Sequence, residues 1–417
     1  MGFQQGLSGL NAASKNLDVI GHNIANSNTT GFKSSRADFA EMVASAIGSA
    51  SGQSSGIGVN VAAVSQQFRQ GSITSTGNSL DIAINGNGFF VVKQADGSTA
   101  YTRAGNFGLD KEGNLKTVDN DNVMGYMVDP ATGKIQSGAT PVPLSFPTGQ
   151  PIPAKQTSKV NVELNLDSRA TLAAGDATAT PPIAATPRAT YGTSLNVYDT
   201  QGTAIPVNLY FEKDATGNTW NIYNSLDATA SPIGQATFDA SGKLTGVTPG
   251  TGTSLNLSIN GGTANPNGLP AFNVEMDFGG LTQFGTKFAV SSLKQDGYTS
   301  GALTGINVGR DGSIVAAYSN GVTRTEGQIA LAAFTNTQGL GSIGNNKWVQ
   351  TADSGPALNG SAQTGTFGSL QAGALEESNV DLTAELVNMM TAQRSYQANA
   401  QTIKTQDQVF STLVNLR

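Results

Sequence analysis

The sequence predicts a mixed fold, with a long α-helix at each terminus and an all-β region between them. Three observations lead to this prediction. Apolar residues recur at alternating spacings of four and three near both ends of the chain, as they do in a coiled coil. The middle consists of short alternating apolar runs separated by Gly, Asp and Pro, which is typical of strands and turns. The chain of 417 residues also exceeds the size of one ordinary domain, so we expect several.

The N-terminal helix is predicted from a stripe that is apolar except at two small residues. The seam formed by this stripe consists of Phe3, Leu7, Leu10, Ser14, Leu17, Gly21 and Ile24. Several Asn residues and a Gly follow Ile24, and both residue types accept left-handed backbone. We therefore expect the helix to end shortly after Ile24.

The C-terminal helix is predicted from a longer seam with the same spacing. Its residues are Leu382, Leu386, Met389, Gln393, Tyr396, Ala400, Ile403, Asp407, Phe410 and Val414. The segment Ser378–Asp381 resembles a capping box and predicts the start of the helix. Because no Gly or Pro follows, we expect a rod of roughly 55 Å at 1.5 Å per residue. The polar Gln393 and Asp407 would set the register of a coiled coil.

The sequence leaves the partner of these two seams open. A helix with one apolar seam cannot bury that seam alone. The two helices could be core helices of one compact domain, or they could form a coiled coil with each other or with other copies of the chain. We favour a coiled coil, because more than 300 residues of different character separate the two helices.

The β-rich middle is predicted to form two domains, one nested inside the other. Five prolines between Pro141 and Pro153 indicate a crossing between domains, and the Gly/Ser-rich residues 48–58 indicate a flexible joint. The predicted boundaries are 1–33 and 370–417 for the terminal helical domain, 34–70 and 359–369 for connecting segments, 71–147 and 285–358 for the inner β-domain, and 148–284 for the outer β-rich domain inserted in it.

The composition excludes several classes of function. With no Cys and one His, the chain has no ligand set for an iron–sulfur cluster or a Cys/His zinc site. The net charge of −6 leaves no basic excess for a nucleic acid or an anionic membrane surface. No apolar run approaches the roughly 18–20 residues of a membrane span. We therefore expect neither nucleic-acid binding nor membrane insertion.

Three short motifs resemble catalytic or binding sequences but lack the context that the chemistry needs. Residues Gly52–Gly56 match a Gly-x-Ser-x-Gly hydrolase elbow, yet they lie in a Gly/Ser run. Residues Asp119–Val123 begin like a calcium loop that then lacks a ligand and its Gly. Residues Asn85–Gly88 lack the third Gly of a dinucleotide fingerprint and read as a hairpin turn. We interpret His22 as a packing or capping residue, and we predict no catalytic residue, no metal site, no cofactor and no enzyme activity.

Two longer motifs, one near each terminus, carry a family resemblance. Leu10–Ser14 and Asn23–Lys33 together resemble the N-terminal motif shared by flagellar rod, hook and hook-associated proteins, and Gly373–Leu382 with Met390–Asn399 resembles the matching C-terminal motif. Asn87–Val91 and Tyr101–Gly105 also resemble the inner β-domain of this family. The motif residues in this chain are Asn23, Ile24, Ala25, Asn26, Gly31, Phe32, Lys33, Ser378, Asn379, Val380, Asp381, Gln393, Arg394, Tyr396 and Asn399.

The ending Lys404–Arg417 resembles the hook members of the family, and the presence of a large β-rich insertion favours a hook member over a rod protein. The resemblance implies a structural subunit that polymerises into a curved, flexible tube outside the cell and acts as a universal joint, transmitting torque from rod to filament. The alternatives are a distal rod or other flagellar axial protein and, from a different class, a secreted β-rich adhesin. The resemblance also implies extracellular localisation in the hook and basal body, with export through the flagellar type III apparatus and no cleaved signal peptide.

The implied partners are copies of the same chain, rod proteins below, hook–filament junction proteins above, and a hook cap during assembly. We expect assembly contacts on the terminal helices, at the larger apolar seam residues. These residues are Phe3, Leu7, Leu10, Leu17, Ile24, Leu382, Leu386, Met389, Tyr396, Ile403, Phe410 and Val414.

Overall fold

The computed structural model describes residues 2–43, 56–129, 134–136, 138–146, 151–215, 217–259 and 270–415. The chain divides into two compact units. The first consists of Met1–Gly149, Thr304–Ala317 and Thr323–Arg417, and the second of Gln150–Leu303 and Tyr318–Val322. The predicted joint at 48–58 and the Gly52–Gly56 motif lie largely outside the described residues, as does part of the proline-rich crossing.

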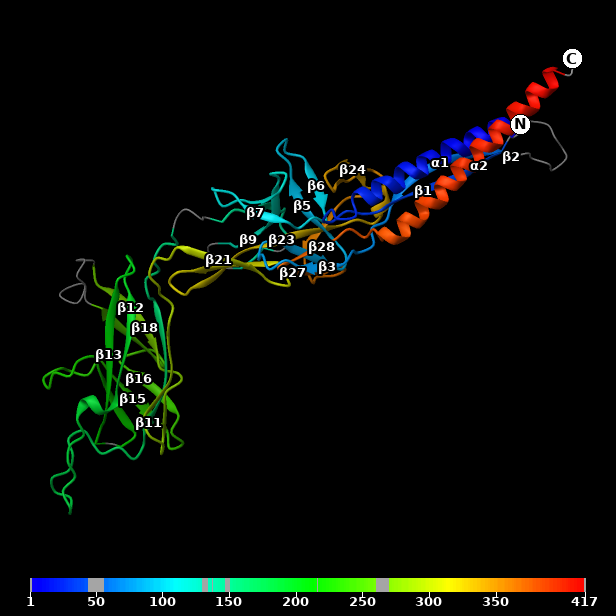
Figure 1. Ribbon diagram of the computed structural model, residues 1–417. Helices are drawn as coiled ribbons and strands as arrows, with labels where there is room; N and C mark the ends of the chain where they lie inside the picture. The colour runs from blue at the N-terminus through cyan, green and yellow to red at the C-terminus, as the bar shows by residue number, and fades with distance from the viewer. Residues whose placement is uncertain are drawn as a thin grey trace. The chain divides into compact units, whose positions relative to one another are not determined.

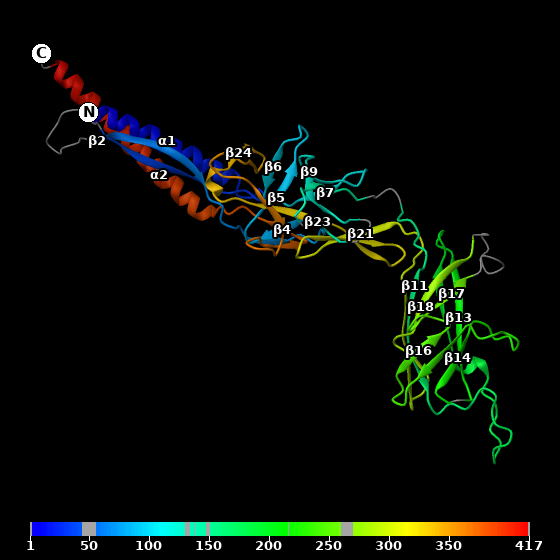
Figure 2. The same ribbon diagram turned by 180° about the vertical axis from the view of Figure 1, so that it is seen from behind.

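The first unit begins and ends with a helix, which confirms the predicted helical termini. The helices are α1 (Gly2–Ala25) and α2 (Leu382–Asn415), and they lie side by side in both views, blue and red in Figure 1 and again in Figure 2. Neither described helix is both long enough and apolar enough to cross a membrane. A middle rich in strands separates them, in agreement with the predicted fold class.

The two helices meet through small residues. A Cβ on Gly6 would lie 3.1 Å from Cγ1 of Ile403, and a Cβ on Gly9 would lie 2.9 Å from Oδ1 of Asn399. Ala13, Ile20 and Asn23 are buried and continue this face at spacings of three, four and seven residues along α1. Because all of these residues except Ile20 are small or polar, the face carries little hydrophobic signal in the sequence.

The predicted seams mostly remain in contact with solvent. Exposed seam residues include Leu386, at 47% exposure, and Phe410, at 57%, together with Phe3, Leu7, Leu382 and Tyr396. The other large apolar residues of the seams that the structure describes are half-buried, namely Leu10, Leu17, Ile24, Met389 and Ile403. The side chain of Val414 lies outside the described part of the chain. The two seams therefore do not close on each other along their length within one chain.

The start of α2 differs from the predicted capping box. The helix begins at Leu382, and Oδ1 of Asp381 accepts hydrogen bonds from the backbone N–H groups of Thr383 at 2.9 Å and Ala384 at 3.1 Å. Asp381 is thus the N-cap, and the capping-box interpretation of Ser378–Asp381, in which Ser378 would be the N-cap, is wrong. The Ser378 hydroxyl instead accepts from the nearby Val380 N–H at 3.3 Å. A carboxylate directly before the first turn satisfies two N–H groups of the helix end and therefore fixes the start.

A β-hairpin lies along the helices. Its antiparallel strands are β1 (Ser35–Val43) and β2 (Gly56–Gln66), and β2 contacts α1. The Gln5 side chain donates to the carbonyl of Gly56 at 2.6 Å, and the Ser8 hydroxyl accepts from the Val59 N–H at 3.3 Å. Part of the region that we predicted as a connecting segment is therefore paired β-structure.

The rest of the first unit is built around a 12-stranded sheet, whose main path runs β21-β22-β23-β9-β5-β6-β25-β24. Phe89, Tyr101 and Trp348 lie in its aromatic core. The strands of this unit are β3 (Ile73–Ser75), β4 (Ile82–Asn85), β5 (Phe89–Lys93), β6 (Thr99–Thr102), β7 (Phe107–Leu109), β8 (Leu115–Thr117), β9 (Asn122–Met127), β10 (Val142–Pro143), β21 (Leu303–Val308), β22 (Ser313–Tyr318), β23 (Thr323–Ala333), β24 (Gly341–Gly344), β25 (Lys347–Val349), β26 (Leu358–Ser361), β27 (Ser369–Ala372) and β28 (Ala374–Glu376), with a short 3-10 turn, η2 (Thr337–Gly339).

The second unit packs two sheets around one apolar core. One sheet has the antiparallel order β12-β13-β14-β15-β16, and the other has the order β17-β18-β11-β19 with β20 paired to β11. Trp220, Phe211 and Phe278 are fully buried between them. The elements are β11 (Lys159–Asp167), η1 (Arg188–Tyr191), β12 (Gly192–Tyr198), β13 (Ala204–Lys213), β14 (Thr219–Tyr223), β15 (Gly234–Phe238), β16 (Leu244–Thr248), β17 (Ser254–Ile259), β18 (Phe272–Asp277), β19 (Thr282–Phe284) and β20 (Ala289–Gln295).

β20 belongs to the second unit because it pairs with β11, a strand of that unit's core. Val160, Val162, Leu164 and Leu166 all face the core, while the residues between them face outward. β20 pairs antiparallel along the same stretch of β11. The second unit accordingly extends past residue 284, the predicted end of the outer domain, to Leu303.

Candidate functional site

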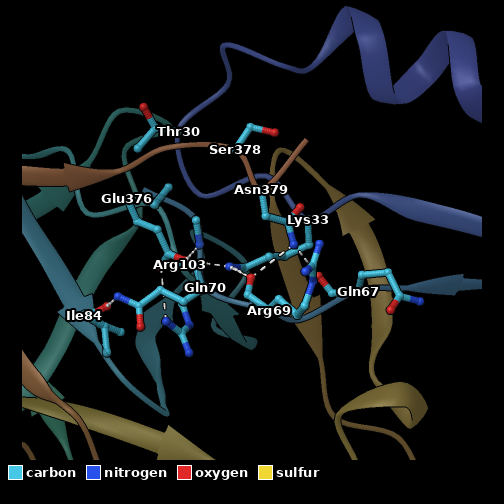
Figure 3. Close-up of polar contacts among 12 residues, drawn as sticks. Thr30, Lys33, Gln67, Arg69, Gln70, Ile84, Arg103, Glu376, Ser378 and Asn379 are labelled. Carbon is cyan, nitrogen blue, oxygen red and sulfur yellow. Dashed lines mark hydrogen bonds and ion pairs between the residues drawn. The ribbon is translucent and has the colours of Figure 1, made fainter. Parts of the chain in front are cut away.

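Segments from both ends of the chain meet in a buried junction next to the paired helices. The segment after α1 reaches Lys33, the segment before α2 supplies Glu376 in β28, and Arg103 follows β6. Figure 3 shows these side chains pointing toward one another, together with the backbone around Arg69. We name Lys33, Arg103 and Glu376 the charge cluster. Its three side chains are almost completely buried.

Glu376 lies at the centre of the charge cluster. Its Oε1 atom accepts hydrogen bonds from Nζ of Lys33 at 2.6 Å and from the backbone N–H of Gly71 at 2.9 Å. Its Oε2 atom accepts from Nη1 of Arg103 at 3.1 Å. Charge-assisted bonds of this kind are about twice as strong as neutral ones. One carboxylate therefore joins three segments that are far apart in the sequence.

The remaining donors of the two cations reach backbone carbonyl groups. Nζ of Lys33 donates to the carbonyl of Arg69 at 2.8 Å, and Nη2 of Arg103 donates to that of Gly86 at 2.9 Å. The Arg103 guanidinium also lies 5.3 Å from the centre of the Phe89 ring. Its Nε atom has no hydrogen-bond partner within the described ranges. The cluster thus contains two cations and one anion.

Burial shifts the two cations in the same direction. Removal from water lowers the pKa of Lys33 from its ordinary value, against the opposing effect of the Glu376 charge. Burial likewise lowers the pKa of Arg103, again against Glu376. A charged group is harder to keep ionised once it is removed from water, so both cations depend on the single carboxylate.

Asn23 ties the end of α1 to the start of β1. Its Oδ1 atom accepts from the backbone N–H of Ser35 at 2.8 Å, and its Nδ2 group donates to the carbonyl of the same residue at 2.8 Å. The Nδ2 group also donates to Oε1 of Glu385 in α2 at 3.1 Å. The amide therefore pairs with both backbone groups of Ser35, as a residue of a neighbouring strand would. Its bond to Glu385 also links the two helices.

Asn379 plays the corresponding part on the C-terminal side. Its Oδ1 atom accepts from the backbone N–H of Ser34 at 2.7 Å. Its Nδ2 group donates to the carbonyl of Gln67 at 2.6 Å and to that of Arg69 at 3.1 Å. One amide side chain thus provides hydrogen-bond partners for backbone groups of three residues, Ser34, Gln67 and Arg69.

Gly31 is the position where the chain turns into the junction. Its φ of +71° lies in the left-handed region, and a Cβ there would lie 2.6 Å from the backbone N of Ala104. Its N–H donates to the carbonyl of Glu376 at 2.8 Å. The next residue, Phe32, is buried and lies 5.4 Å from the ring of His22. Only Gly fits this combination of turn and close approach.

Some of the predicted motif residues lie in or beside the junction, and the others lie outside it. Asn23, Gly31, Phe32, Lys33 and Asn379 lie in the junction, and Ser378 is buried beside it. Asp381 caps α2, while Ile24 and Val380 are half-buried and Asn399 lies against Gly9. Three residues are exposed on α2, namely Gln393, Arg394 and Tyr396, and so is Ala25 on α1, whereas Asn26 donates to the carbonyl of His22 at 2.9 Å.

Sequence reasoning did not single out Arg103 or Glu376 as site residues. Both fall within motifs that carry the family resemblance, yet their position in the sequence does not show that they meet. Charged residues make up 12% of the chain, so a charged residue inside such a motif was the signal that could have drawn attention to them. That both positions would be buried, at 4% and 0% exposure, is evident only from the fold.

The calcium-loop lookalike lies in the turn between β8 and β9 and contains a second ion cluster. Nζ of Lys347 pairs with the carboxylate of Asp119 at 2.8 Å and with that of Asp121. The ammonium group neutralises oxygen atoms that a cation would need. In the described part of the chain, no group of three or more His, Asp and Glu side chains is placed to hold a metal ion.

Four family models match successive parts of the chain. They are described as a flagella basal body rod protein (residues 3–33), the flagellar hook protein FlgE/F/G D1 domain (83–165), the flagellar basal body protein FlaE D2 domain (165–298), and the flagellar basal body rod FlgEFG protein C-terminal (371–416). Together they cover more than half of the sequence and reach both termini.

Curated relatives and one solved structure agree with these matches. The chain is 42% identical to the flagellar hook protein FlgE of Salmonella typhimurium and 43% identical to that of Escherichia coli, in each case over 100% of both chains. The fold is also similar to the crystal structure of a flagellar hook protein of Helicobacter pylori, with a TM-score of 0.52 and 17% identity over 73% of this chain and 100% of that one. The chain therefore belongs to the flagellar hook protein family and is a structural subunit of the hook.

Proposed function

We propose that this subunit polymerises through its terminal helices into a curved, flexible tube that acts as a universal joint between rod and filament. The observation that carries the proposal is the exposure of the two apolar seams. Leu386 and Phe410 remain exposed to solvent although α1 and α2 are paired, with Gly6 against the seam residue Ile403 and Gly9 against Asn399. Large apolar side chains arranged at heptad spacing indicate a further helical partner.

The partner that fits best is another copy of the same chain. The seams of α1 and α2 have matching spacing, and a repeating polymer supplies each subunit with the same surface from its neighbours. In this arrangement the seams form the coiled coil that the sequence predicts, between chains rather than within one. Gln393 and Asp407 are exposed on α2 and would fix the register between copies.

The β-rich parts would provide contacts that yield during rotation. Charged residues make up 12% of the chain, so few directional ion pairs have to break when neighbouring subunits slide. We propose the inner and outer β-domains as successive layers outside the helices, with the outer domain making the lighter contacts. Family membership supports the remaining partners, which are rod proteins, junction proteins, a hook cap and the type III export apparatus, and an extracellular location.

Introducing a negative charge into the seam of α2 tests the proposal. In full-length protein, Leu386→Asp and Phe410→Asp place a carboxylate in the proposed contact, while Gln401→Asp places one on an exposed position of α2 outside the seam. We expect circular dichroism to show that all three variants fold, and we expect the two seam variants to remain soluble. Sedimentation and electron microscopy should show tubes for the wild type and for Gln401→Asp, but none for the two seam variants. Tubes formed by either seam variant would contradict the proposal.

A further inference from the structure

The charge cluster contains more cations than anions and is buried. Lys33 and Arg103 share a single carboxylate, and both Lys33 and Glu376 have side chains with 0% exposure. By contrast, Lys159 in the second unit lies near two carboxylates and is 45% exposed. Removing one partner of a buried ion pair is strongly destabilising because it leaves an uncompensated charge, and here the loss of one anion would leave two such charges.

The three members of the charge cluster come from distant parts of the sequence. Lys33 is bonded to a residue 343 positions away, and Arg103 to the same residue 273 positions away. The N-terminal segment and the β-domain therefore both supply cations, and the C-terminal segment supplies the compensating charge. The carbonyl of Glu376 also accepts from the Gly31 N–H, so docking of the N-terminal turn and arrival of the carboxylate are coupled.

We propose that Glu376 is a positioning residue that makes docking of the N-terminal segment conditional on the presence of the C-terminal segment. Without Glu376, the two cations would be left in the junction with the carbonyl groups of Arg69 and Gly86 as their acceptors. The cost of two buried, uncompensated charges would keep the segment around Lys33 undocked. Under this proposal, the segment that follows α1 docks only in a chain whose C-terminal segment has already placed Glu376 in the junction.

This arrangement predicts an asymmetry between the partners of one ion pair. Lys33→Met removes one cation and leaves Arg103 and Glu376 as a balanced pair. Glu376→Gln keeps the size and shape of the side chain but leaves both cations uncompensated. An ion pair that merely stabilises the fold would respond similarly to the loss of either partner. A charge cluster with an excess cation responds much more strongly to the loss of its anion.

Hydrogen exchange on the soluble, full-length chain tests this asymmetry. The readout is the exchange rate of backbone N–H groups in residues 29–36 and 374–381, which include the bonded groups of Gly31 and Ser34. We expect Glu376→Gln to accelerate exchange there by roughly 100-fold or more, and Lys33→Met by roughly 10-fold or less, since removing the sole partner of a buried charge is costly. The double variant Lys33→Met/Glu376→Gln should exchange more slowly than Glu376→Gln alone.

Two controls separate this effect from general unfolding. Glu275→Gln removes a half-exposed carboxylate that lies 3.7 Å from Lys159 in the second unit, and it should leave exchange in the junction unchanged. Exchange within β13 should stay the same in all variants, because its core is in the second unit. Equal acceleration by Lys33→Met and Glu376→Gln, no acceleration by Glu376→Gln, or an unprotected junction in the wild type would each overturn the proposal. The test uses the single chain, so its result is independent of whether the seams polymerise.

Discussion

The second unit and the helical pair bury their side chains in opposite ways. The second unit encloses its largest apolar residues, and Trp220 and Phe278 have 0% exposure between its two sheets. The helical pair buries small residues such as Gly6 and Ala13 and leaves large ones such as Phe410 in solvent. The second unit thus completes its core within a single chain. The helical pair has no partner surface within the chain that buries its larger apolar residues along the described parts of α1 and α2.

The difference shows where stability resides in the isolated subunit. Hydrophobic burial contributes in proportion to the apolar area removed from water, so the second unit obtains most of its stability from its own residues. The helical pair depends on close backbone approach, on the bonds of Asn23 and Asn379, and on the charge cluster. Changes in the two regions should therefore differ in size and in what they disturb.

The largest expected effect is the loss of Trp220 from the core of the second unit. Trp220→Ala should lower the free energy of unfolding of this unit by about 3–5 kcal/mol, because it removes a large buried side chain and leaves a cavity. Denaturant titration followed by hydrogen exchange in β13 and β14 would measure it. Leu226→Ala, at an exposed position of the same unit, should cost far less. Similar costs for both variants would mean that this unit does not depend on its enclosed core.

A smaller effect is expected from enlarging the face that joins the helices. Gly6→Leu would force side-chain atoms against Ile403, whose Cγ1 atom is 3.1 Å from the position of a Cβ, and overpacking typically costs about 1–3 kcal/mol. Gly21→Leu is the matched control, because among the described residues no atom beyond the adjacent residues and the local helix backbone lies within 4 Å of a Cβ there. Thermal unfolding followed by far-UV circular dichroism should show a lower midpoint for the helical signal in Gly6→Leu only. Equal midpoints would show that the two helices do not pack through Gly6.

The smallest expected effect is a loss of stability of the second unit in acid, through the exposed turn that contains Asp239. Hydrogen bonds from the Ser241 hydroxyl and the Lys243 backbone N–H hold the pKa of the Asp239 carboxyl below its usual value. A depressed folded pKa contributes stability that is present above the unfolded pKa of about 3.9 and is lost as the pH falls through the lower folded value. Denaturation midpoints of the second unit measured between about pH 6 and pH 2 should fall with acid in the wild type.

The same titration with Asp239→Asn tests which group is responsible. That variant should be less stable at neutral pH and should show a shallower fall in acid, and Ser241→Ala should change the profile in the same direction. An unchanged profile in Asp239→Asn would assign the acid dependence to other carboxylates of the unit.

Much of the fold could be predicted because its pattern is local. The alternation of Val160, Val162 and Leu164 identifies a strand, and the spacing of Leu382, Leu386 and Met389 identifies a helix, whatever these elements pack against. The family resemblance likewise depends on contiguous residues at the termini. The helical termini and the β-rich middle were therefore accessible from the sequence alone.

The pairing of elements was not accessible, because it depends on distant residues. Heptad spacing identifies an apolar seam but cannot show that the helices approach each other at Gly6 and Gly9, which have no hydrophobic side chain. The charge cluster requires Arg103 and Glu376 to meet across 273 positions. The position of the α2 cap was missed for a local reason, since Ser378 and Asp381 are both good capping residues and only the backbone decides between them.

The two tryptophans of the chain lie in different units, and this gives the subunit a built-in optical reporter. Trp220 is enclosed in the second unit, whereas Trp348 belongs to the aromatic core of the first and donates through Nε1 to Oε1 of Gln66 at 2.5 Å. Replacing either indole with Phe leaves a chain whose tryptophan fluorescence comes from one unit. A pair of such variants would allow the melting of each unit to be recorded separately, without dyes or labels, in a full-length subunit.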